Sequence, residues 1–159
     1  MKKSSTIFLQ VVIVLIGIVA LAIMIRFPLT EGRAVNLDLF SIYSDPFIIY
    51  GYIVSIAFFV ALYQAFKLLG YIGQNKVFSL NSVKALRTIK YCAMTLVVFI
   101  VGAEAYFFIA VRGKDDIAGG VAIGLVMIFL SAVIATAAAV FERTLQSAVD
   151  IKSENDLTV

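Results

Sequence analysis

The sequence predicts an all-α integral membrane protein, a single domain in which a bundle of four helices crosses the bilayer. Hydrophobic residues make up 62% of the 159 residues and charged residues only 14%, whereas a soluble domain needs about 25% charged residues. The mean hydropathy of +1.04 agrees with this composition. Four apolar windows are long enough to cross about 30 Å of hydrocarbon as helices, and they cover residues 7–25, 47–69, 91–111 and 118–141.

The first predicted span begins in a way that resembles a secretory signal peptide. Two lysines precede the apolar run of residues 7–25, and Ala20 and Ala22 have the spacing of a cleavage site. The apolar run is longer than the core of a usual signal peptide. We therefore expect this segment to remain in the protein as a membrane anchor.

The segment between the first two spans, residues 27–46, contains the passage NLDLFSIY at 36–43. Its alternation of apolar and polar residues predicts a short strand or a surface turn. We expect the whole segment to be a plain connector on the outer side of the membrane. The alternative interpretation is a surface that senses a ligand.

Small residues recur at intervals of four in the second and fourth spans. They are Gly51, Ser55, Ala57, Ala61 and Ala65 in the second span, and Gly120, Gly124, Ser131, Ala135 and Ala139 in the fourth. Such series let the backbones of membrane helices approach closely. They predict packing within the bundle, with the seam of a homo-oligomer as the alternative.

The cytoplasmic loop of residues 70–90 predicts a basic amphipathic helix before the third span. Ser79 or Asn81 is the expected N-cap. The apolar face of this helix comprises Val83, Leu86, Ile89 and Ala93, and its basic residues are Lys84, Arg87 and Lys90. We expect the helix to lie on the inner leaflet before it turns or runs into the third span. Anionic lipid would attract each basic residue by about 1 kcal/mol.

Glu104 is the only ionisable residue deep within a predicted span. Because a carboxyl group in hydrocarbon is costly, such a residue needs a partner or has a function. We expect its side chain to face the bundle and to bond there to a hydroxyl group, a backbone group or water. A structural role is the first interpretation, since Arg112 lies eight residues on, and a role in transport is the alternative.

The cytoplasmic tail, residues 142–159, predicts a helical C-terminal extension of the fourth span. Its apolar stripe comprises Phe141, Leu145, Ala148 and Val149. Its acidic groups are Glu142, Asp150, Glu154, Asp156 and the terminal carboxylate, against Arg143 and Lys152, which leaves a net charge of −3. Residues 67–90 carry five cations and no acid. Two oppositely charged elements can close on each other or hold a partner between them.

Basic residues divide unevenly between the two sides of the predicted membrane domain. Nine lie on the side of both termini and four on the other side. The nine are Lys2, Lys3, Lys67, Lys76, Lys84, Arg87, Lys90, Arg143 and Lys152, and the four are Arg26, Arg33, Arg112 and Lys114. Because cytoplasmic segments carry the excess of lysine and arginine, we expect both termini to be cytoplasmic.

The sequence lacks the parts from which most catalytic sites are built. It contains no histidine and a single cysteine, Cys92, and it has neither a Gly-rich phosphate loop nor a nucleophile beside a base. We therefore expect no enzyme and no site for a metal or a cofactor. The net charge is only +3, and the basic loop is short, so direct binding of nucleic acid is not expected.

Two motifs stand at the predicted cytoplasmic face, VFSLNSVKALRTIKY at 77–91 and ERTLQSAVDIKSENDLTV at 142–159. Both resemble motifs of a bacterial family of four-span membrane proteins, domain of unknown function 2975. The matching positions are Val77, Phe78, Ser79, Leu86, Arg87, Ile89 and residues 154–159. Members of this family are often encoded beside a small helix-turn-helix regulator. The resemblance therefore implies that the protein tethers or inhibits a transcription factor.

These observations together predict a regulatory or scaffold protein of the bacterial inner membrane that binds a small cytoplasmic partner, such as that regulator. The expected partner-binding residues are Phe78, Ser79, Lys84, Arg87, Lys90, Glu154, Asn155, Asp156 and Leu157. The alternative function is a small transporter or permeation subunit that uses Glu104. Substitution of Glu104 should abolish only transport, whereas changes at 84–90 or 154–159 should abolish only docking.

The predicted topology can be tested by cysteine labelling in intact cells, with Cys92 replaced by serine. A cysteine at Glu31 or at Asp116 should react with a membrane-impermeant maleimide, because both positions are expected on the outer side. A cysteine at Asn75 or at Ser153 should react only after the membrane is opened. The reverse pattern of labelling would contradict cytoplasmic termini.

Overall fold

The computed structural model of the chain describes residues 3–30, 36–111 and 117–157, and every regular element in these ranges is helical. In chain order the helices are α1 (Lys3–Thr30), the short α2 (Leu39–Tyr43), α3 (Pro46–Gly73), α4 (Leu80–Tyr106), a π-helical segment (Phe107–Val111) that continues α4, and α5 (Ala118–Leu157). Four of these helices are long and apolar enough to cross a membrane. The predicted all-α arrangement of four helices is therefore confirmed.

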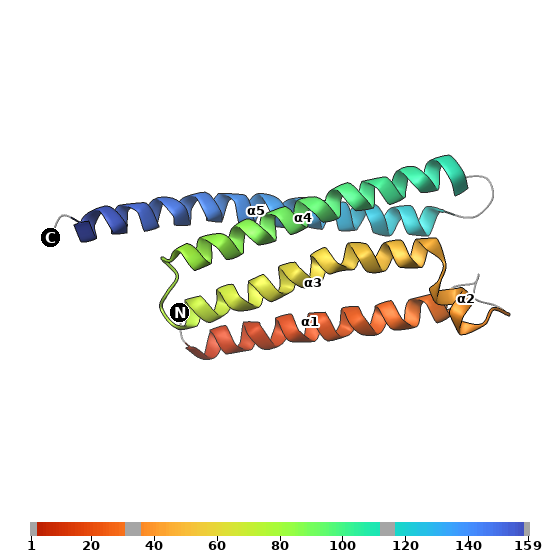
Figure 1. The fold of residues 1–159 in the computed structure, drawn as a ribbon, viewed down its shortest axis with the longest axis horizontal. Coiled ribbons are helices and arrows are strands. Elements are labelled where there is room, and N and C mark those ends of the chain that lie inside the picture. Colours follow the sequence, from red (N-terminus) through yellow and green to blue (C-terminus); the bar gives the residue numbers. More distant parts are fainter. Residues whose placement is uncertain (1–2, 31–35, 112–116, 158–159) are drawn as a thin grey trace.

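The four long helices run alternately up and down (Figure 1). Helices α1, α3 and α4 follow one another across the molecule in a row, and α5 crosses α4 in this view. Each packs mainly against its neighbour in the sequence, and α4 and α5 share the most extensive interface among the described residues. The start of α1 and the end of α5 lie at the same end of this row. That end is called the terminal end below.

Helix α1 meets α3 at glycines that leave room for polar side chains near the terminal end. A Cβ atom on Gly73 would lie 3.1 Å from Cγ2 of Thr6, and a Cβ atom on Gly70 would lie 3.5 Å from Nε2 of Gln10. Nε2 of Gln10 donates to the backbone carbonyl of Phe66 at 3.2 Å. Close approach and one interhelical hydrogen bond thus fix this interface, as is typical of helices in a membrane.

The small residues that the sequence assigned to bundle packing do not all take part in it. In α5, Gly124 and Ser131 are buried, as predicted. In α3, Gly51 is exposed, and nothing lies within 4 Å of a Cβ atom placed on it. The close contacts of α3 with α1 lie instead at its other end, at Gly70 and Gly73, which the interval of four does not predict.

Three tyrosine hydroxyl groups tie neighbouring helices together away from the terminal end. The bonds run to backbone carbonyl groups, from Tyr43 to Ile25 (2.9 Å), from Tyr52 to Met24 (3.0 Å) and from Tyr50 to Phe99 (2.7 Å). The first two join α2 and α3 to α1, and the third joins α3 to α4. A tyrosine in an apolar environment needs such a partner for its hydroxyl group.

The predicted strand at 36–43 is not found, because helix α2 occupies residues 39–43, whereas the alternative, a turn, is present at Asn36. The described residues contain no strand that could pair with this segment. Without a partner strand, the alternation of apolar and polar residues cannot stabilise a β-strand here. Asp45 then caps α3 by accepting from the backbone N–H groups of Phe47 (2.8 Å) and Ile48 (3.3 Å). Pro46 occupies the start of α3, where its missing N–H group costs nothing.

The predicted basic amphipathic helix is present as the first part of α4, and it runs without a break into the third span. Ser79 is its N-cap, as predicted, and its hydroxyl oxygen accepts from the backbone N–H group of Ser82 at 3.3 Å. The apolar face is covered by protein and does not lie on a leaflet. The buried residues at the start of α4 are Ser82, Val83, Ala85, Leu86 and Ile89. Neighbouring helices that continue to this level cover the face that the sequence assigned to lipid.

Helix α5 has 40 residues, about 60 Å at 1.5 Å per residue, which confirms the helical C-terminal extension. Its buried or half-buried residues recur at alternating intervals of four and three, the spacing of closely packed helix pairs. This series, called the seam below, comprises Gly124, Ile128, Ser131, Ala135, Ala138, Glu142, Leu145 and Val149. Phe141, which the sequence placed on the apolar stripe, is exposed. Glu142 takes the inward position.

Loss of the Tyr50 hydroxyl group should weaken the contact between α3 and α4. We expect Tyr50→Phe to lower the free energy of unfolding in detergent micelles by about 0.6–1.7 kcal/mol, the range for hydrogen bonds between membrane helices. Tyr63→Phe is the matched control, because that tyrosine is exposed and its hydroxyl group makes no hydrogen bond within the described residues. Equal effects of the two substitutions would contradict a specific role of the Tyr50 bond.

Candidate functional site

The terminal end of the row contains the predicted partner-binding residues of α4. Ser79 is the N-cap of α4, so its hydroxyl group has a structural role. Phe78 precedes the cap and Lys84 lies in the first turns of the helix, and both side chains are exposed. The other two predicted residues, Arg87 and Lys90, turn toward α5.

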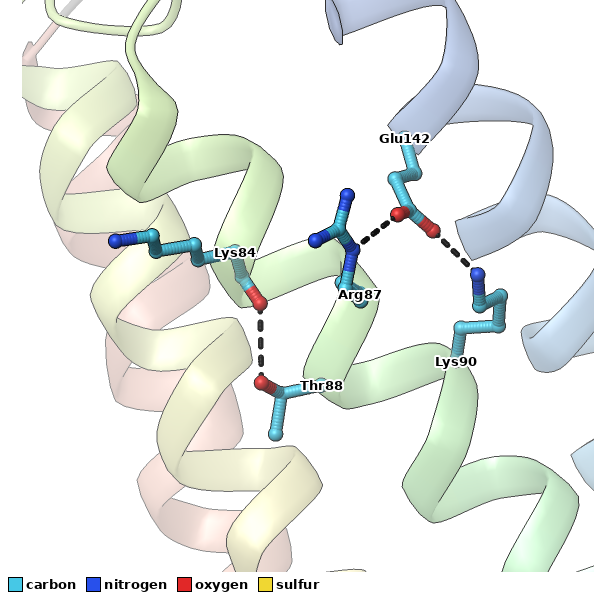
Figure 2. A network of polar contacts seen from close by, with 5 residues as sticks. All are labelled: Lys84, Arg87, Thr88, Lys90 and Glu142. Atoms are coloured by element: carbon cyan, nitrogen blue, oxygen red, sulfur yellow. Dashed lines mark hydrogen bonds and ion pairs between the residues drawn. The ribbon is translucent and has the colours of Figure 1, made fainter.

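Arg87 and Lys90 both bind Glu142 of α5 (Figure 2). Nε of Arg87 donates to Oε1 of Glu142 at 2.6 Å, and Nζ of Lys90 donates to Oε2 at 2.7 Å. The Glu142 side chain is 9% exposed, whereas that of Arg87 is 52% exposed and that of Lys90 22%. One buried carboxylate is thus held between two cations that reach the surface. These three residues are called the clamp below.

The clamp lies where the apolar parts of α4 and α5 end. The apolar run of α5 stops at residue 141, and that of α4 begins at residue 91. The ammonium group of Lys90 also lies 4.7 Å from the ring centre of Tyr91, a cation–π contact. Because a buried carboxylate is costly once it loses its partners, the clamp fixes α5 against α4 at this level.

Among the described residues, the basic segment and the acidic tail meet, as the sequence predicted, through the acidic residue Glu142. Glu154 and Asn155 are exposed on α5 and lie about 18 Å beyond Glu142 along the helix, so the clamp forms without them. The side chains of Asp156 and Leu157 lie outside the described part of the chain. Whether these four residues bind a partner stays a prediction.

Glu142 is the residue of the clamp that the sequence did not single out. Composition presents it as one of several acidic residues in the tail. Its register does distinguish it, because it continues the seam from Ala135 and Ala138. A charged residue on a series of small, inward-facing positions is a signal that an opposite charge lies on the facing helix.

Glu104 faces the interior of the helix pair, as predicted, and is 8% exposed. Its carboxyl group lies against Gly124 of α5, where an added Cβ atom would overlap Oε1 and would stand 2.7 Å from Cδ. Oε2 is buried and has no hydroxyl or backbone partner within the described residues, so water, the third predicted partner, stays a prediction. Arg112, the cation considered for it, lies outside the described residues. Only glycine at position 124 leaves room for this carboxyl group.

The helix that carries Glu104 changes its form directly beyond it. Residues Phe107–Val111 form a π-helix, a form that is frequent at functional sites. The ring of Phe107 lies 5.2 Å from the ring of Phe47 on α3, between centroids. A Cβ atom on Gly120 of α5 would lie 3.3 Å from Cε2 of the same ring. Phe107 therefore touches both helices that flank α4.

An apolar groove with a volume of about 340 Å³ opens beside this region. It is lined by Pro46, Phe47, Tyr50, Gly102, Ala103 and Tyr106. Its described walls come from α3 and α4, and two tyrosines are the only ionisable residues among them. These described residues offer no charged group with which to bind a polar solute.

Comparisons with known proteins agree with a membrane protein. Residues 25–159 match the family described as "Protein of unknown function (DUF2975)". Over its whole length the chain is 48% identical to the "Uncharacterized membrane protein YoaS" of Bacillus subtilis (strain 168), in an alignment of 162 residues that also covers the whole of that protein. No solved structure matches the chain. Neither match assigns an activity.

Removal of the Glu142 carboxylate should loosen α5 from α4. We expect Glu142→Gln to lower the free energy of unfolding by about 1.5–3 kcal/mol, the range for hydrogen bonds to charged groups. Arg87→Gln should cost less, because Arg87 is half exposed and solvent screens its charge. Unfolding in detergent micelles measures both, with exposed Arg143→Gln as the control. If the costs of Glu142→Gln and Arg87→Gln add in the double variant, the two residues do not interact.

The contact between Glu104 and Gly124 predicts a substitution that is harmful only while the carboxyl group is present. Gly124→Ala should destabilise the protein by about 1–3 kcal/mol, the usual cost of overpacking, because the carboxyl group can retreat only toward hydrocarbon. In a Glu104→Ala background the same change should be neutral. Gly119→Ala is the matched control, since nothing lies within 4 Å of a Cβ atom there. A cost of Gly124→Ala that persists without Glu104 would contradict this geometry.

Proposed function

The chain belongs to the family described as "Protein of unknown function (DUF2975)", and we propose that it is a regulatory or scaffold protein of the bacterial inner membrane. In this proposal its cytoplasmic end binds a small protein partner, and it catalyses no reaction. The observation that carries the proposal is the clamp. It holds α5, a helix of 40 residues, against α4 at the point where the apolar part of α5 ends.

The distribution of charge supports a cytoplasmic location for the terminal end. Most basic residues of the described ranges lie in or beside helix ends there, namely Lys67, Lys76, Lys84, Arg87, Lys90, Arg143 and Lys152, whereas Arg26 lies toward the other end of α1. Cytoplasmic segments of membrane proteins carry such an excess. We therefore place both ends of the chain in the cytoplasm.

The docking arm of this proposal is the part of α5 beyond the clamp, residues 143–157. Asp150, Ile151 and Glu154 are exposed on it, so the arm presents acidic groups beside a large apolar side chain. Such a helix fits a partner surface that has an apolar groove with basic residues at its rim. Asp150, Glu154 and Asp156 against Arg143 and Lys152 give the arm a net charge of −1. An anionic leaflet therefore does not attract it, which keeps it available to a soluble protein.

A small helix-turn-helix regulator is the partner that the resemblance to the family implies. The DNA-binding face of such a protein is basic, and the acidic arm is complementary to it. A regulator held on the arm at the membrane would be withdrawn from its DNA sites. The membrane protein itself needs no contact with nucleic acid in this mechanism.

A second candidate function is transport through Glu104. The observation that favours it is a buried carboxyl group with one oxygen that has no hydrogen bond within the described residues. In membrane spans such groups often line the paths of protons, ions and solutes. Glu104→Gln separates the two candidates, because it should abolish transport and leave the docking arm unchanged.

Site-specific crosslinking tests the docking arm. The full chain carries benzoylphenylalanine at Ile151, in cells that also produce a small helix-turn-helix regulator of the kind often encoded beside genes of this family. We expect a crosslink to the regulator, because Ile151 is exposed at the centre of the arm. Asp150→Lys combined with Glu154→Lys should remove the crosslink, because it reverses the acidic charge of the arm.

The same photoreactive residue at Ile123, which is exposed on the apolar part of α5, is the matched control and should give no crosslink to the regulator. Absence of a crosslink from Ile151, or a crosslink that survives the double charge reversal, would contradict docking on the arm. Loss of the crosslink in Glu104→Gln would contradict the separation of the two candidate functions.

A further inference from the structure

The clamp uses only part of the Arg87 guanidinium group. Its Nε atom donates to Glu142, and no hydrogen bond of the two terminal nitrogens is found within the described residues. Figure 2 shows the Lys84 side chain, one turn earlier on α4, extended away from Arg87. Within the described residues, Lys84 has no ion pair and Arg87 has none besides Glu142. The two terminal nitrogens of Arg87 are therefore open to an anion, and the flexible side chain of Lys84 starts one turn away on the same helix.

Lys84 and Arg87 are the first two residues of a stripe of exposed residues along α4. The positions follow at alternating intervals of three and four, the spacing of a single helix face. The stripe continues through Tyr91, Met94, Val98 and Val101, all exposed. From Tyr91 to Val101 it extends about 15 Å, which equals the depth of hydrocarbon in one leaflet, half of about 30 Å.

Two lysine–tyrosine pairs mark the level of the lipid headgroups beside this stripe. Nζ of Lys90 lies 4.7 Å from the ring centre of Tyr91 on α4, and Nζ of Lys67 lies 5.3 Å from that of Tyr63 on α3. Because α3 and α4 are antiparallel, the end of α3 and the start of α4 bring these pairs to similar levels. Exposed tyrosines with cationic neighbours are typical of the membrane interface.

We propose that Arg87 and Lys84 bind the phosphate group of an anionic phospholipid, with an acyl chain along the stripe from Tyr91 to Val101. A guanidinium group can bind a phosphate through two parallel hydrogen bonds, and Lys84 adds a second positive charge. Glu142 positions the guanidinium group by holding its Nε atom.

A phospholipid fits this surface better than a free phosphate or an acidic peptide does. Only the lipid combines an anionic head with an apolar chain one leaflet long, and the stripe offers both parts in that order. The site stands independently of the proposed docking function, because the docking arm lies on α5 beyond the clamp. Failure of either proposal would leave the other intact.

Native mass spectrometry of the full chain released from nanodiscs tests this site. The nanodiscs contain equal amounts of phosphatidylcholine and phosphatidylglycerol, and the readout is the ratio of the two lipids retained on the protein. We expect the wild type to prefer phosphatidylglycerol and Arg87→Lys to reduce this preference about tenfold, because lysine keeps the charge but loses the two parallel bonds. Lys84→Gln should also reduce it, without a change at Glu142.

Arg143→Gln is the matched control, because it removes an exposed positive charge from the same end without a change in the stripe. Its preference for phosphatidylglycerol should remain, which separates a defined site from general attraction between basic residues and anionic lipid. An equal loss in all three variants, or no preference in the wild type, would overturn the proposal. Displacement of the lipid by excess inorganic phosphate, or a crosslink from position 84 to a protein partner, would overturn it as well.

Discussion

Helices that lie in hydrocarbon gain nothing when they cover apolar surface with one another, and this constraint decides how the row is held together. Association depends on close approach at small residues and on polar groups that have no water to bond instead. The α1–α3 interface is held by two glycines and Gln10, and the α3–α4 interface by the Tyr50 hydroxyl group. The α4–α5 interface contains two carboxyl groups, those of Glu142 and Glu104. Because so few atoms specify each interface, a single substitution can loosen it.

The two carboxyl groups between α4 and α5 have different surroundings, and this difference assigns them different roles. Both oxygens of Glu142 are bonded to cations that reach the surface, so this residue acts as a fixed joint between the helices. Glu104 lies on Gly124 with one oxygen that has no bond within the described residues. This difference supports our proposal of docking on the arm that the joint directs, with transport through Glu104 as the second candidate.

The fold could be predicted wherever the local sequence decides the outcome, as the apolar windows decide the four helices and Ser79 decides the start of α4. For the site, the sequence predicts the type of interaction but not the residue that makes it. Opposite charges predict that the basic segment meets the tail, but which acidic residue makes the contact depends on the register of α5 against α4. Phe141 and Glu142 differ by about 100° around the helix, and an apolar preference places the wrong one inward. The place of Glu104 opposite Gly124 depends on how α4 and α5 pack, which no local pattern contains.

Whether Glu142 fixes the direction of the docking arm can be measured most directly by pulsed double electron–electron resonance. Nitroxide labels at Asn81 on α4 and at Lys152 on the arm, with Cys92 replaced, report the distance between these elements in nanodiscs. We predict one narrow distance distribution in the presence of Glu142 and a broad one in Glu142→Gln, with Arg143→Gln unchanged. The same narrow distribution in Glu142→Gln would contradict the role of the clamp, because packing along the seam would then be sufficient to direct the arm.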